Sequence, residues 1–278
     1  MSASLADRQE VVNFGCRLNI AEGEAIRSAV HAAGAQGTIV FNSCAVTDEA
    51  VRQARQAVRR ALRERPDAEV VVTGCAAELE RETFAAMGAR VVSNDAKGLA
   101  ESYRIEEQNG ASTTPDQVRG RTGLGNGSTH QPFALSLSKG RPYSPALSGA
   151  DHARAFLGVQ TGCSHSCTFC ATVLARGTAR SASIDAVAAS AQTALDRGQR
   201  EIILTGVDLA SYGDDSGATL AALVEALLAL PVERLRLSSL DPDRIDDALF
   251  ALLTQEKRVM PHVHLSLQAG DDMVLTRM

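Results

Sequence analysis

The chain has 278 residues, 45% of them apolar, and a formal net charge of -5. A chain of this length and composition can form the cores of about two globular domains. The acidic balance argues against indiscriminate nucleic-acid binding, although it is compatible with a local basic patch. No uncharged apolar run is long enough to cross a bilayer, and the N-terminus lacks the basic and apolar regions of a signal peptide. The sequence therefore predicts a cytoplasmic protein with no membrane partner.

Residues 9–105 alternate short β-branched runs with helical stretches. The pattern predicts strands at residues 10–14, 38–42, 69–73 and 89–92, with helices after the first three. This βαβ rhythm is typical of a parallel sheet with helices on its faces. We therefore expect an N-terminal parallel α/β sheet domain, with ligand sites at the carboxyl ends of its strands.

Three cysteines, Cys16, Cys44 and Cys75, follow the first three predicted strands, one after each. A single cysteine of this kind is more often an ordinary core residue. In a reduced compartment, however, cysteines act as metal ligands or reactive thiols more often than they form disulfides. Because all three occupy the same strand-to-helix position, they are predicted to converge as a metal site.

A helix predicted over residues 51–65 carries five arginines, namely Arg52, Arg55, Arg59, Arg60 and Arg63. Four of them are spaced three and four residues apart, which puts them on one face. This face could contact RNA phosphates. A solvated face balanced by the nearby acids Glu49 and Glu64 explains the pattern equally well.

Residues 106–150 differ from the rest of the chain. They are rich in Gly, Ser, Thr and Pro and have few periodic apolar positions. This composition is typical of a segment that cannot build a packed core. We expect a largely disordered linker or insertion.

The βα rhythm returns in residues 151–278. Strands are predicted at 156–160, 201–205, 234–238 and 262–268, and helices at 184–197 and 220–230. Successive βα units favour a partial (β/α) barrel with functional groups at the carboxyl ends of its strands. In the last two strands, polar residues alternate with Leu and Val, which predicts a polar interior around a ligand and an apolar face packed against helices. Exposure at a sheet edge is the alternative.

Cys163, Cys167 and Cys170 form a C-x3-C-x2-C run just after the first of these strands. Three thiolates on one short loop can hold three irons of a [4Fe-4S] cluster and leave the fourth iron open to a small molecule. A zinc site with His165 or a distant residue as the fourth ligand is the alternative, although zinc motifs more often pair two C-x2-C hooks.

Together, these motifs resemble those of the radical S-adenosylmethionine (SAM) methylthiotransferases. The similarity covers most of the chain outside the predicted linker, and it is closest to the members that modify N6-threonylcarbamoyladenosine beside the anticodon of tRNA. The motifs that carry it are Gly15 to Asn19, Asn42 to Thr47, Thr73-Gly74-Cys75, Gly162 to Cys170, Ala175-Arg176-Gly177, Leu204 to Leu209, and His262 to Gly270.

The resemblance implies two [4Fe-4S] clusters, one SAM-cleaving and held by Cys163, Cys167 and Cys170, the other auxiliary and held by Cys16, Cys44 and Cys75. It implies that a 5′-deoxyadenosyl radical removes hydrogen from C2 of the adenine, where a methylthio group is added. The implied contacts to SAM are Thr205, Gly206, Asp208, Ser238 and Gln268.

The implied partners are the tRNA anticodon loop and an electron donor such as a flavodoxin-type reductant. The sulfur donor is not specified by the motifs. Members that act on isopentenyladenosine in tRNA, or on an aspartate of a ribosomal protein, share the same cysteines and are alternatives.

Two features depart from the family pattern. Cys170 is followed by Ala171, Thr172 and Val173, where family members commonly carry a proline, so the loop is expected to be looser without losing a ligand. The chain stops at Met278, before the last barrel strands and the small RNA-binding β-barrel domain of the family. We expect an exposed sheet edge and weak tRNA affinity, and a truncated, catalytically impaired remnant that binds clusters is the competing interpretation.

Overall fold

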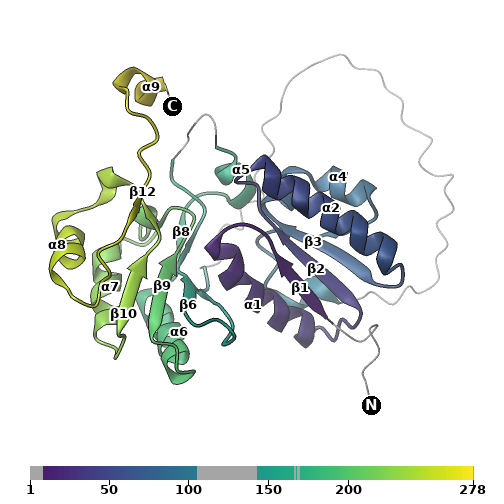
Figure 1. Ribbon diagram of the computed structural model, residues 1–278, viewed down its shortest axis with the longest axis horizontal. Helices are drawn as coiled ribbons and strands as arrows, with labels where there is room; N and C mark the ends of the chain where they lie inside the picture. The colour runs from purple at the N-terminus through teal and green to yellow at the C-terminus, as the bar shows by residue number, and fades with distance from the viewer. Residues whose placement is uncertain (1–8, 105–142, 166, 168–169, 278) are drawn as a thin grey trace.

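The computed structural model describes residues 9–104, 143–165, 167 and 170–277. Within them, two α/β units lie side by side, the N-terminal one in purple and blue and the second in teal to yellow (Figure 1). Helix α1 (Arg17–Ala32) lies between the two sheets and contacts both. No helix in these residues is long and apolar enough to span a membrane.

The N-terminal sheet is fully parallel, and its four strands lie side by side in chain order. They are β1 (Glu10–Asn13), β2 (Thr38–Ser43), β3 (Glu69–Gly74) and β4 (Arg90–Val91). The central strand β2 is buried along its whole length, as expected for a parallel strand covered on both faces. The predicted parallel sheet is confirmed, with each strand end within one residue of its predicted position.

Helices cover both faces of this sheet because successive strand residues point to opposite sides. The helices are α1, α2 (Asp48–Glu64), α3 (Cys75–Leu79), α4 (Arg81–Ala86) and the 3-10 helix η2 (Ala100–Tyr103). Ile39 and Phe41 pack with α2, α3 and α4 on one face. Val40 and Val71 pack with α1 and η2 on the other.

The second sheet has the order β10-β9-β6-β5, in which the first three strands are parallel and β5 is antiparallel. Its strands are β5 (Ala146–Leu147), β6 (Ala155–Gly158), β9 (Glu201–Thr205) and β10 (Arg234–Leu237). The helices of this unit are α6 (Ile184–Asp196), α7 (Leu220–Leu228) and α8 (Asp247–Gln255), and together with the strands they enclose one apolar core. This is the predicted partial (β/α) barrel.

Short elements continue this sheet at its carboxyl end. β7 (Gln160–Thr161) pairs antiparallel with β8 (Arg180–Ser181), and β11 (Ser239–Leu240) pairs parallel with β12 (His264–Leu265). The loop cysteines lie between β7 and α5 (Thr172–Arg176), and α9 (Asp272–Arg277) projects from the rest of the molecule (Figure 1). The carboxyl end of the second sheet is therefore built mostly from loops and one-turn elements.

The predicted linker ends earlier than the sequence indicated. Most of it, residues 106–142, lies outside the described residues. Residues 143–150, which were also assigned to it, contain β5, an edge strand whose Ala146 and Leu147 pair with β6. A two-residue strand next to Pro145 has no periodicity from which it could be predicted.

The last predicted strand is also shorter than expected. Only His264 and Leu265 are in strand, because the pairing with β11 covers two residues. Leu265 and Leu267 are 45% and 73% exposed instead of packed against helices, which corrects the predicted apolar face. The chain then adopts a left-handed conformation at Gln268, with φ of 61°, which breaks the alternation.

The polar face of β10 has a structural use. Arg234 and Arg236 form ion pairs with Glu201 of β9 at 3.1 and 2.7 Å. The two charges of this strand therefore stabilise the pairing of β9 with β10, and they are no evidence for a ligand cavity.

Gly74, at the turn from β3 into α3, is expected to tolerate no side chain. Its φ is 93°, and a Cβ there would lie 2.2 Å from the Ser43 carbonyl oxygen. Gly74→Ala should lower the free energy of unfolding by about 1–3 kcal/mol, measured by urea denaturation of the metal-free chain. Gly98→Ala is the control, because a Cβ at Gly98 meets nothing within 4 Å. Equal effects in the two variants would contradict this interpretation.

Candidate active site

The three N-terminal cysteines lie at one edge of the first sheet. Cys16 precedes α1, Cys44 follows β2, and Cys75 begins α3. All three are free thiols, and Cys44 interacts with both of the others. The structure therefore brings these thiols together at the carboxyl ends of β1, β2 and β3.

A glycine permits the close approach of the first two cysteines. Gly15 has φ of 85°, and a Cβ there would lie 2.5 Å from Cys44 Sγ, so a larger residue would displace this thiol. Hydrogen bonding between the thiols raises the pKa of Cys16 and lowers the pKa of Cys44 to about 6. Cys44 therefore ionises readily, which suits a thiolate ligand.

Cys163, Cys167 and Cys170 share the second loop, of which residues 166, 168 and 169 lie outside the described residues. The backbone N–H of His165 donates to Cys163 Sγ at 3.4 Å, and the Cys170 N–H donates to the Cys167 carbonyl at 3.1 Å. Burial raises the pKa of Cys163 to about 11, and the charges of Asp208, Cys167 and Cys170 act in the same direction. Cys167 and Cys170 therefore both lie within electrostatic reach of Cys163.

Gln160 connects this loop to the end of β9, and the sequence motifs did not identify it. Its Oε1 accepts the backbone N–H groups of Val207 and Asp208 at 3.0 and 3.1 Å. Its Nε2 donates to the Gly162 carbonyl at 2.7 Å. One buried amide thus holds the strand-end turn against the cysteine loop.

Asp208 lies beside the loop thiols. Its Oδ2 is 3.7 Å from Cys163 Sγ and 3.4 Å from His165 Nε2, and it accepts a hydrogen bond from the Ser211 hydroxyl. A second carboxylate, Asp241, lies 3.8 Å from the same imidazole nitrogen. This side of the loop is therefore acidic, which suits a positively charged group such as an amine or sulfonium.

Four of the five residues predicted to contact SAM lie at the ends of β9 and β10. Thr205 and Ser238 are buried, Gly206 packs against Gln160, and Asp208 borders the cysteine loop. Gln268 differs because it lies in an exposed turn beyond β12, and its side chain makes no hydrogen bond to the described residues. The structure therefore groups the first four and leaves Gln268 apart.

Arg176, the last residue of α5, reaches from the loop cysteines to the first triad. Its Nε donates to Cys75 Sγ at 3.0 Å, and its amino groups donate to the two carboxylate oxygens of Glu22 at 2.8 and 3.1 Å. Asn19 and Thr161 accept further hydrogen bonds from it at 2.9 and 3.2 Å. The sequence motifs included Arg176 without giving it a role.

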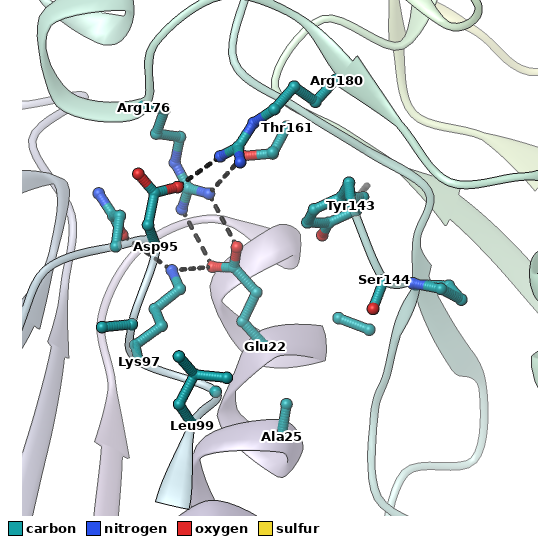
Figure 2. Close-up of a pocket in the computed structure, with 15 residues that line it drawn as sticks. Glu22, Ala25, Asp95, Lys97, Leu99, Tyr143, Ser144, Thr161, Arg176 and Arg180 are labelled. Carbon is teal, nitrogen blue, oxygen red and sulfur yellow. Dashed lines mark hydrogen bonds and ion pairs between the residues drawn. The ribbon is translucent and has the colours of Figure 1, made fainter. Parts of the chain in front are cut away.

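Glu22 and Lys97 complete this buried network, and Figure 2 shows their side chains converging with Arg176. Lys97 Nζ lies 2.6 Å from Glu22 Oε2, and the side chains of Arg176, Glu22 and Lys97 are only 3%, 7% and 8% exposed. Burial alone would raise the pKa of Glu22, but the charges of Arg176 and Lys97 lower it to about 2. At Lys97, the effect of burial outweighs the attraction of Glu22 and lowers the pKa of the ammonium group. The pKa of Arg176 is instead raised, so Arg176 is the counter-ion of Glu22 over a wider pH range.

A cavity of about 610 Å³ adjoins this network between α1, residues 94–99 and residues 143–146 (Figure 2). Glu22, Lys97 and Arg176 line it, as does Arg180, which pairs with Asp95 at 2.6 Å. The charged residues of its wall are therefore paired with one another.

The cysteine sets suit clusters better than single ions. Among residues 9–104, 143–165, 167 and 170–277, no three His, Cys, Asp or Glu side chains are grouped so that they could hold one metal ion. In a [4Fe-4S] cluster each thiolate binds a different iron, so the thiols surround a shared volume instead of one point. Within the same residues, the buried Ser238 Oγ makes no hydrogen bond, which leaves a polar atom for a ligand. The donor set therefore fits two clusters and a polar cofactor such as SAM.

Half of the basic face of α2 is neutralised, since Arg52 pairs with Glu49 at 2.6 Å and Arg55 pairs with Glu80. Arg60, which lies off this face, pairs with Glu64 at 2.9 Å. Among the described residues, Arg59 and Arg63 form no ion pair, so the charge-balanced interpretation accounts for two of the four arginines.

Both units match family models. Residues 8–93 match "Uncharacterized protein family UPF0004", and residues 157–278 match the radical SAM superfamily. A Treponema pallidum protein named threonylcarbamoyladenosine tRNA methylthiotransferase MtaB is 32% identical over 96% of this chain and 67% of its own length. The Rickettsia prowazekii protein of the same name is 39% identical over 98% of this chain. The chain belongs to the radical SAM methylthiotransferase family.

The chain spans 61% of the length of its Rickettsia relative. A Lawsonia intracellularis protein named tRNA-2-methylthio-N(6)-dimethylallyladenosine synthase is 27% identical over 96% of the chain and 61% of its own length. Among solved structures, the radical SAM methyltransferase TsrM from Kitasatospora setae matches with a TM-score of 0.58 and 12% identity. The match covers 96% of this chain and 60% of the TsrM chain. At that identity the likeness shows a shared fold.

Proposed function

We propose that this methylthiotransferase adds a methylthio group to C2 of N6-threonylcarbamoyladenosine beside the anticodon of tRNA. The observation that carries the proposal is the pair of cysteine triads, one at the carboxyl edge of each sheet, joined through Arg176. A single triad would support SAM cleavage alone. Two triads provide ligands for a second cluster, which sulfur insertion needs.

In this proposal Cys163, Cys167 and Cys170 hold the SAM-cleaving cluster, and Cys16, Cys44 and Cys75 hold the auxiliary cluster. When bound, the clusters and SAM supply the electron, the radical and the sulfur for attack on an unactivated C–H bond.

The chain's own residues provide position and charge around this chemistry. Gln160 holds the turn after β9 against the cysteine loop. Asp208 provides a carboxylate 3.7 Å from Cys163 Sγ, a charge that would suit a cationic group of SAM, and the buried hydroxyl of Ser238 is available to accept or donate a hydrogen bond.

The names of the relatives and the accessibility of loop bases support the proposed substrate class. Relatives that are 39% and 32% identical are named for threonylcarbamoyladenosine, whereas the relative named for dimethylallyladenosine is 27% identical. An unpaired anticodon-loop base can enter a pocket without melting a duplex. A low-potential electron donor of the flavodoxin type would supply the electron.

The test uses the full chain, reconstituted anaerobically with iron and sulfide and supplied with SAM and reductant. Three tRNAs are compared, carrying threonylcarbamoyladenosine, isopentenyladenosine or unmodified adenosine at the same position. Nucleoside mass spectrometry should find a methylthio group only on threonylcarbamoyladenosine. Modification of isopentenyladenosine instead would overturn the substrate, and 5′-deoxyadenosine formation without any tRNA product would favour the remnant interpretation.

A further inference from the structure

Arg176 forms a continuous chain of contacts between the two cysteine sets. The Cys163 N–H donates to the carbonyl of Gly177, the next residue after Arg176, at 3.2 Å. Gly162 packs so closely on this segment that a Cβ would lie 2.0 Å from the Thr178 carbonyl oxygen. The guanidinium then donates to Cys75 Sγ at 3.0 Å. The residue next to Arg176 is thus bonded to the loop triad, and the side chain of Arg176 is bonded to the N-terminal triad.

The guanidinium is held in place by a buried ion pair. Arg176 and Glu22 have side chains that are only 3% and 7% exposed, and buried charges are stable in proteins when they are paired. The amino groups of Arg176 donate to the two carboxylate oxygens of Glu22 at 2.8 and 3.1 Å. This pairing leaves Nε to donate to Cys75 Sγ.

Hydrogen bonds to ligand sulfur and nearby charge are among the features that set the reduction potential of an iron–sulfur cluster. A donor on the sulfur and a positive charge both favour the more negative, reduced form, and so raise the potential. A nearby carboxylate has the opposite effect.

On this basis, and resting on the proposed function, we propose that Arg176 is a positioning residue of the auxiliary cluster. It orients Cys75 and raises the reduction potential of the cluster bound there. It also connects that cluster, through a chain of hydrogen bonds, to the cysteine loop that holds the SAM-cleaving cluster. Glu22 holds the guanidinium in place and limits the rise in potential.

The test isolates the auxiliary cluster in the full chain by replacing Cys163, Cys167 and Cys170 with alanine. In that background, the reduction potential is measured by anaerobic titration monitored by electron paramagnetic resonance. Arg176→Met should shift the potential downward, Glu22→Gln should shift it upward, and Arg176→Lys should give a smaller downward shift than methionine. Arg180→Met, four residues further on and paired with Asp95, is the control and should leave the potential unchanged.

Opposite shifts of the reduction potential in the arginine and glutamate variants support the proposal. A merely structural role would shift the two potentials in the same direction or leave both unchanged. An unchanged potential in Arg176→Met, or shifts of the same sign, would overturn it. If the methionine variant assembles no cluster, the potential of the lysine variant is measured instead, and it must lie below the potential of the parent. Failure of the parent to assemble a cluster would instead contradict the proposed function.

Discussion

Replacing Cys163 with alanine should abolish the formation of 5′-deoxyadenosine from SAM. Three thiolates are needed to hold a [4Fe-4S] cluster whose fourth iron is open to SAM, and Cys163 is one of the three on its loop. The loss should be complete, because no other cysteine of the loop is available to replace it. The measurement is liquid chromatography with mass spectrometry of the reaction under anaerobic conditions.

Cys75→Ala is the matched control for this variant. It removes a thiol of the other triad, on α3 of the first unit, so SAM cleavage should continue while methylthiolation is lost. Iron should fall from about eight to about four per chain in both variants, since each holds one remaining cluster. Loss of SAM cleavage in Cys75→Ala, or its survival in Cys163→Ala, would contradict the assignment of the two triads.

Replacing Glu22 with glutamine should cause a large loss of stability in the metal-free chain. The variant leaves Arg176 and Lys97 buried without their carboxylate partner, and breaking a buried pair costs about 3–5 kcal/mol. The control is Glu24→Gln on the same helix, where the carboxylate pairs with Arg27 at a partly exposed position and the expected loss is about 0–1 kcal/mol. Urea denaturation of both variants provides the comparison, and equal losses would contradict a special role for Glu22.

The same carboxylate should make stability fall in acid. The pKa of Glu22 is lowered from 4.5 to about 2 in the folded chain. Its contribution is therefore fully present above pH 4.5 and is lost as the pH falls toward 2. Glu22→Gln should lack this part of the acid dependence, which denaturation at a series of pH values between these limits would reveal.

The sheets and the cysteine placement could be predicted because their signals are local. β2 and β3 are runs of β-branched and apolar residues, and each is followed directly by a cysteine at a strand-to-helix junction. The C-x3-C-x2-C spacing likewise lies within eight residues of sequence.

The contacts that join the two units could not be predicted in this way. Arg176 and Glu22 are separated by 154 positions, and no periodic pattern relates them. Glu22 lies in an ordinary helical sequence, and only packing of α1 between the two sheets shows that it is buried. Gln160 was missed for a similar reason, since a single glutamine at a strand end carries no motif.

The exposed Leu265 and Leu267 show what the alternation of side chains along a strand cannot predict. Alternation predicted one packed face for Val263, Leu265 and Leu267, but only Val263 packs against the core. β12 ends at Leu265, so Leu267 beyond it has no sheet to hold it against helices. Pairing length depends on the neighbouring strand, which sequence alternation does not report.

We expect this chain to hold two separate [4Fe-4S] clusters, one of which cleaves SAM. Anaerobic quantitation of iron and sulfide on the reconstituted chain, together with mass spectrometry for 5′-deoxyadenosine after addition of SAM and reductant, tests it most directly. We predict about eight irons and eight sulfides per chain, as two such clusters require, and reductant-dependent formation of 5′-deoxyadenosine. Stoichiometric zinc, or about four irons with no SAM cleavage, would contradict the account.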